Sequence, residues 1–131
     1  MAIKVMKFLR YGFALMFLSA GFCHFIFHQQ FSGAVPDVLV FQGYINAFVG
    51  GLELFVGALL LTKYHNVALK ISFLLLVIFV WSHIYFIQIG SCVDGICLPE
   101  WISWARLIVV HPVLLFMNFL LLKNDRDKVN I

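Results

Sequence analysis

Residues 44–89 read YINAFVGGLELFVGALLLTKYHNVALKISFLLLVIFVWSHIYFIQI, and this stretch decides the fold. Two apolar runs, 44–61 and 67–89, flank a short polar turn that carries Lys63. A helix rises about 1.5 Å per residue, so each run is long enough to cross a hydrocarbon core about 30 Å thick. The stretch therefore predicts two antiparallel membrane-spanning helices.

Two further apolar runs, 7–28 and 101–122, extend this pattern toward both ends of the chain. Of the 131 residues, 63% are hydrophobic and 11% are charged, whereas roughly a quarter of the residues in a soluble domain are charged. The first run lacks a small-residue cleavage site, so we expect it to be retained as a helix. Because the connections are short, sequential helices should be antiparallel neighbours. We predict one domain over residues 1–131, an all-α integral membrane four-helix up-down bundle.

The placement of positive charge predicts how the bundle is oriented. Basic residues occur before or at the start of the first run, between the second and third, and after the fourth: Lys4, Lys7, Arg10, Lys63, Lys70, Lys123, Arg126 and Lys128. The connections 29–43 and 90–100 contain neither lysine nor arginine. Since short loops rich in these residues stay in the cytoplasm, we expect both termini there and both other loops outside. The net charge of +3 is divided among these segments, so we expect contact with the lipid bilayer and no nucleic acid partner.

Two charged residues lie within the predicted spans. Glu53 is near the middle of the second helix, and Arg106 is in the outer part of the fourth. A charged side chain at the bilayer centre costs about 2.5–3.5 kcal/mol even on the more lenient scale. We expect Glu53 and Arg106 to form an ion pair inside the bundle. Two interpretations stay open: the pair holds the helices together, or Arg106 faces a cavity and binds an anionic or carbonyl-bearing group.

Polar side chains from all four helices reach a similar depth in the outer half of the bundle. They are Cys23, His24, Asn46, Glu53, His83 and Arg106. This common depth predicts a polar pocket that opens to the external side.

A metal or haem would need histidines from two helices. His24 and His28 are four residues apart and share one helix face, and His83 lies at a depth compatible with His24. With Cys23, these residues are weak candidate ligands. Their spacing matches no recognised metal motif, so we predict no metal site.

Cys92 and Cys97 lie in the second external loop, separated by Val-Asp-Gly-Ile. On the oxidising side of a membrane such a pair can persist as a disulfide. The bridge is either a structural staple or an exchanging redox pair, and the sequence leaves both open. Cys23 is then an inert buried thiol or a resolving thiol for the pair.

Three segments carry a resemblance to the DoxX-like membrane proteins. AGFCHFIFHQQFSGAVP resembles the family's first-helix signature, GGLELFVGALLL its second helix, and WARLIVVHPVLLF its fourth. The matching positions are Ala20, Gly21, His24, Phe25, Pro36, Glu53, Gly57, Arg106 and Leu107. The chain departs from the family at His83, where many relatives carry a smaller amide, and in the pair Cys92/Cys97, which is not a family hallmark.

The resemblance implies a four-helix bundle of bacterial inner membranes. It favours an accessory or small catalytic component of thiol or sulfur–quinone redox chemistry on the periplasmic side. A quinone would then be the cofactor, bound by Arg106, His24 and His83.

The alternative is a non-enzymatic assembly factor or structural subunit that binds another membrane protein or forms a homo-oligomer. Gly43, Ala47 and Gly51 recur every fourth residue and predict close packing against a neighbouring helix, which fits this alternative. Binding of a small lipid, a metal or haem is a weaker third interpretation.

Overall fold

Four helical segments in the computed structural model, which describes residues 2–129, are long and apolar enough to cross a membrane. These segments are α1 (Ala2–Ile26), α3 (Gln42–Leu60), α4 (His65–Gln88) and the continuous run of α5 (Glu100–Ala105), π-helical η1 (Arg106–Val110) and α6 (His111–Val129). The connections hold a short helix and a two-stranded antiparallel hairpin: α2 (His28–Gly33), β1 (Cys92–Val93) and β2 (Ile96–Cys97). The predicted all-α four-helix bundle is confirmed.

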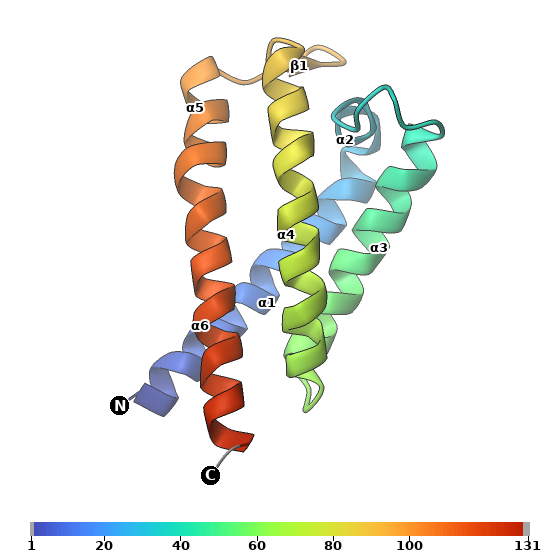
Figure 1. The fold of residues 1–131 in the computed structure, drawn as a ribbon. Helices are drawn as coiled ribbons and strands as arrows, with labels where there is room; N and C mark the ends of the chain where they lie inside the picture. Colours follow the sequence, from blue (N-terminus) through green and yellow to red (C-terminus); the bar gives the residue numbers. More distant parts are fainter. Residues whose placement is uncertain (1, 130–131) are drawn as a thin grey trace.

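The helices alternate in direction, so both ends of the described chain and the α3–α4 turn lie at one end of the molecule, and α2 and the hairpin lie at the other (Figure 1). α1 crosses the bundle obliquely and packs mainly on α3, while α4 lies between α3 and α6 (Figure 1). This arrangement gives the bundle two walls, one built by α1 with α3 and one built by α4 with the last helical run.

Several helix boundaries differ from those predicted. The first helix begins at Ala2 rather than at residue 7, and the loop predicted over 29–43 contains α2. The last helix continues to Val129 instead of ending near 122. Its polar extension contacts α4, because Asp125 Oδ2 lies 3.0 Å from His65 Nε2. Hydropathy alone misses these polar turns because they extend beyond the apolar runs.

Glycines bring α1 and α3 unusually close together. A Cβ placed on Gly50 would lie 2.6 Å from the Cβ of His24, and one on Gly21 would lie 2.9 Å from the carbonyl oxygen of Gly50. Gly57 packs against Leu18 in the same way. Small residues of this kind let helix backbones approach in a membrane protein.

The stripe of Gly43, Ala47 and Gly51 does not form the close contact between α1 and α3. Gly51 has no neighbouring atom within 4 Å of a Cβ placed on it, so it lies outside the α1–α3 contact. A repeat at every fourth residue places side chains on one face of a helix but does not show which neighbour that face meets. The face of α3 that carries Gly50 and Gly57 is the one that packs against α1.

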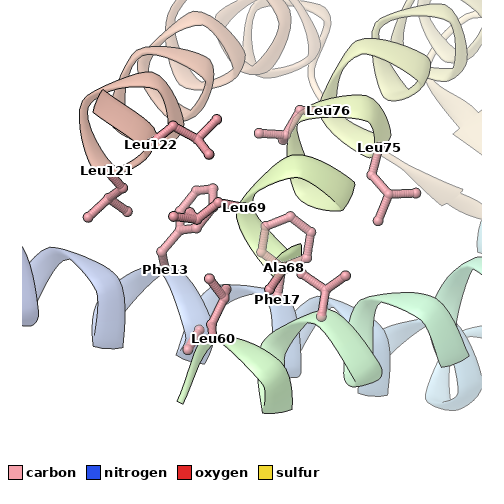
Figure 2. Packing of buried hydrophobic residues seen from close by; sticks show 11 residues of the cluster. Phe13, Phe17, Leu60, Ala68, Leu69, Leu75, Leu76, Leu121 and Leu122 are labelled. Atoms are coloured by element: carbon pink, nitrogen blue, oxygen red, sulfur yellow. The ribbon is translucent and has the colours of Figure 1, made fainter. Parts of the chain in front are cut away.

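The apolar core fills the end of the bundle that carries the α3–α4 turn. Its fully buried side chains come from all four long helices: Phe13, Phe17, Val56, Leu60, Ala68, Leu69, Leu76 and Leu121. Figure 2 shows them converging between the helices. This half also holds a buried polar contact, in which Asn118 donates to Ser72 and to the carbonyl oxygen of Leu69. The buried polar groups Asn46 and Glu53 lie outside the apolar core cluster.

Replacing Gly50 by alanine tests the close approach of α1 and α3. The added methyl group collides with His24, so we expect Gly50→Ala to lower the free energy of unfolding by about 1–3 kcal/mol. Gly51→Ala is the matched control, because its methyl group meets open space, and we expect it to be as stable as the wild type or up to about 1 kcal/mol more stable, since alanine favours a helix over glycine. Equilibrium unfolding in mixed micelles measures both. Equal losses for the two variants would contradict the assigned contact.

Candidate functional site

A cavity of about 460 Å³ occupies the half of the bundle opposite the apolar core. Five of the six residues from which the pocket was predicted line it, namely His24, Asn46, Glu53, His83 and Arg106, whereas Cys23 is not among the lining residues. Aromatic and aliphatic side chains form most of the remaining surface, among them Phe31, Trp81, Phe86 and Leu114. The cavity therefore combines apolar walls with a few polar groups, which is typical of sites for small molecules.

Asn46 organises the polar groups on the wall formed by α1 and α3. Its Nδ2 donates to the carbonyl oxygen of His24 at 2.9 Å and lies 3.0 Å from Nδ1 of His28. Its Oδ1 lies 2.6 Å from Nδ1 of His24. On the other side of the same ring, His24 Nε2 lies 3.1 Å from Oε2 of Glu53. Asn46 and Glu53 are buried, with 1% and 3% of their surface exposed.

These contacts determine where protons lie on His24. A backbone carbonyl can only accept, so the Asn46 atom facing it must be the amide nitrogen, and Oδ1 must face the ring. Nδ1 of His24 therefore carries a proton. One further proton is needed between Nε2 and Oε2, because otherwise a ring lone pair would face a carboxylate oxygen. Whichever group carries it, the His24–Glu53 pair has no net charge.

The contact between His24 and Glu53 is a charge contact rather than an aligned hydrogen bond. Oε2 of Glu53 is buried, and no donor among residues 2–129 meets hydrogen-bond geometry with it. Glu53 also lines the cavity. Its carboxyl group therefore retains the capacity to accept a hydrogen bond from a molecule bound there.

The predicted ion pair between Glu53 and Arg106 is wrong. Glu53 contacts His24, and no salt bridge joins it to Arg106 in the described part of the chain. The physical reason is helix adjacency, because α3 packs on α1 and α4, whereas Arg106 belongs to η1 and approaches the cavity from the opposite wall. Similar depth in the membrane placed both residues at one level without bringing them together.

The second wall is organised around His111, which the sequence analysis did not assign to the pocket. His111 is buried and donates from Nε2 to the carbonyl oxygen of Leu76 on α4. The ring of His83 packs edge-on against it, with centroids 5.0 Å apart. Both histidines line the cavity with Arg106.

Arg106 begins the π-helical turn Arg106–Val110, directly before His111 and Pro112. A π turn holds one extra residue, which rotates the side chains before it by about 100° relative to those after it. Proline favours such a break because it lacks an N–H for the regular ladder. Pro112 was the one sequence signal that could have drawn attention to His111.

The hairpin carries the disulfide and borders the cavity. Cys92 and Cys97 are paired residues of β1 and β2 and are joined by a disulfide. The two-residue connection, Asp94-Gly95, has positive φ angles of 49° and 81°, as a tight hairpin turn requires. Between the cysteines, Val93 and Ile96 line the cavity. Cys23 is a half-buried free thiol on α1.

Two hairpin residues contact α2. Val93 lies against Gly33, because a Cβ placed on Gly33 would come within 2.2 Å of Cγ1 of Val93. Gln30 Nε2 donates to Asp94 Oδ2 at 3.5 Å. The hairpin is therefore docked over the outer end of the cavity.

No family model, curated protein or solved structure matches this chain. Among residues 2–129, no group of three or more histidine, cysteine or acidic side chains is arranged to hold a metal ion. Of the weak candidate ligands, His24 and His28 meet at Asn46, and His83 lies on the other wall. The arrangement is suited to binding an amphipathic molecule between two polar clusters.

The role of Asn46 can be tested by truncation. We expect Asn46→Ala to lower the free energy of unfolding by about 1–3 kcal/mol, because it leaves buried groups of His24 without partners. Asn66→Ala, at the half-buried start of α4, is the control and should have a smaller effect. Equilibrium unfolding in micelles compares the two variants, and equal effects would argue against a network centred on Asn46.

Proposed function

We propose that this protein is a DoxX-like component of thiol–quinone redox chemistry on the periplasmic side of a bacterial inner membrane. In this proposal the outer cavity binds the quinone head group, and Cys92 and Cys97 form the thiol pair. The observation that carries the proposal is that the hairpin holding the disulfide also supplies Val93 and Ile96 to the cavity lining. The thiol pair would thus be carried by the same hairpin as part of the cavity lining, with the two cysteines one residue away from Val93 and Ile96 along each strand.

The polar groups of the cavity suit a ring with two carbonyl oxygens. Arg106 supplies N–H donors on one wall. On the other wall, the unsatisfied carboxyl oxygen of Glu53 can accept a hydrogen bond from a ring hydroxyl of the reduced form. Apolar residues between these groups, such as Phe17 and Leu76, would contact the faces of the ring.

The electron balance requires a second thiol partner. Oxidation of Cys92 and Cys97 to a disulfide releases two electrons and two protons, and a quinone supplies the acceptor for both. To begin another cycle the disulfide must be reduced by thiol exchange with an external dithiol. The exposed positions of both cysteines are compatible with such an exchange.

Thiol trapping of the membrane-embedded protein tests this function. We expect Cys92 and Cys97 to become a dithiol under mild reductant and to return to a disulfide when an oxidised quinone is added. Cys23→Ala should behave like the wild type, because Cys23 is a free thiol on α1 and the disulfide joins Cys92 to Cys97. Alkylation with a mass-shifting maleimide followed by gel electrophoresis reports both states.

A pair that stays locked as a disulfide, or that reoxidises at the same rate without quinone, would contradict the redox role. The cysteines would then be a structural staple. In that case a non-enzymatic assembly factor or structural subunit becomes the better proposal, with the polar groups around Glu53 and Arg106 shaping the binding site.

The proposed orientation can be tested separately. With both termini in the cytoplasm, a membrane-impermeant maleimide should label reduced Cys92 and Cys97 in intact cells. Thr62→Cys, in the exposed α3–α4 turn, should be labelled only after the membrane has been permeabilised. The reverse pattern would place the hairpin in the cytoplasm and remove the periplasmic assignment.

A further inference from the structure

Arg106 lines the cavity, and no acidic side chain among residues 2–129 forms a salt bridge with it. The chain has six acidic residues, all within residues 2–129. Glu53 contacts His24, and four others contact different groups: Asp37 meets Gln42, Asp94 meets Gln30, Glu100 meets Trp104 and Asp125 meets His65. The sixth, Asp127, is exposed near the end of α6.

The other groups of the cavity do not neutralise Arg106. The His24–Glu53 pair shares one proton and sums to zero charge. His83 and His111 also line the cavity, but an imidazole is either neutral or positive and can only add positive charge. The ionisable groups lining the cavity therefore carry at least one uncompensated positive charge.

The walls around this charge are mostly apolar. Phe17, Leu76, Phe79, Val110 and Leu114 line the same cavity as Arg106. An unpaired charge in such surroundings is costly, and within membranes such charges are paired or face a polar ligand. A small inorganic anion would neutralise Arg106 but would leave the apolar walls without contacts.

We propose that the outer cavity binds an organic anion, an apolar molecule with one acidic oxygen that pairs with Arg106. Guanidinium groups bind carboxylate and phosphate oxygens through two parallel hydrogen bonds. A fatty-acid carboxylate, an alkyl phosphate and an ionised ring hydroxyl share this chemistry. The inference rests on the proposed function in placing the ligand in this cavity, and it adds the charge that the ligand carries.

Competition binding on the purified full-length protein tests the inference. The probe is radiolabelled myristic acid, and the competitors are unlabelled myristic acid, methyl myristate, tetradecyl phosphate and a neutral decyl-substituted quinone. Loss of a buried charge pair weakens binding roughly 30-fold or more, so the acid should compete at least about 30-fold better than its methyl ester. Equal competition by acid and ester would overturn the inference, as would the absence of saturable binding by both acid and alkyl phosphate.

Variants identify the residue responsible. Arg106→Gln should lower affinity for the acid by a similar factor and remove the preference over the ester. Arg106→Lys, which keeps the charge, should recover part of the affinity for the acid. Arg10→Gln, at the end of α1 away from the cavity, should bind the acid like the wild type. A preference that survives in Arg106→Gln would overturn the inference. The comparison of acid with ester in the wild type holds even if Arg106→Gln fails to fold.

The remaining competitors distinguish a carboxylate ligand from a phosphate ligand. They also distinguish the failure of this inference from the failure of the quinone proposal. Stronger competition by tetradecyl phosphate than by myristate indicates a lipid phosphate, and the reverse indicates a carboxylate. If the neutral quinone competes in the wild type and the acid shows no advantage over its methyl ester, this inference fails and the quinone proposal stands. If the acid binds through Arg106 and the quinone never competes, the inference stands and the quinone proposal fails.

Discussion

The close approach of α1 and α3 at Gly21 and Gly50 is the constraint on which the outer half of the structure depends. With no side chain at either position, the backbones come near enough for His24 to reach Glu53 and for Asn46 to bond the His24 carbonyl. The buried polar groups of α1 and α3 thus find most of their partners within this pair of helices. The acidic residue is neutralised within that wall, and Arg106 on the facing wall has no acidic partner among the described residues.

Because of this separation of charges, a cavity lies between the two walls in place of a Glu53–Arg106 ion pair. A Glu53–Arg106 bridge would have closed the space between the walls and left nothing for a ligand to neutralise. The π-helical turn at Arg106–Val110 and the packing of His83 on His111 belong to the second wall, which carries Arg106. The hairpin docked on α2 then covers the outer end, so the cavity is bounded by packed side chains on one side and by a disulfide-bearing loop on the other.

The sequence was sufficient to predict the four helices, because run length and hydropathy report directly on what can cross a bilayer. It also identified five of the polar residues that line the cavity, since depth along a helix follows from the rise per residue, but it did not assign His111 to the cavity. It was insufficient to predict which of them touch. Whether Glu53 meets His24 or Arg106 depends on how α3 is rotated and which helix packs against it, and that is decided by Gly50 rather than by the more conspicuous stripe through Gly51. The short helix α2 and the π turn depend on local packing that no periodicity reveals.

Double-mutant cycles on unfolding free energy test the central claim, that Glu53 is neutralised by His24 and not by Arg106. The cycle of Glu53→Gln with His24→Phe should give a coupling energy of about 1–3 kcal/mol, since the two side chains are in contact. The cycle of Glu53→Gln with Arg106→Gln should give less than about 0.5 kcal/mol. Strong coupling between Glu53 and Arg106, with none between Glu53 and His24, would contradict the account and return Arg106 to the role of a structural partner.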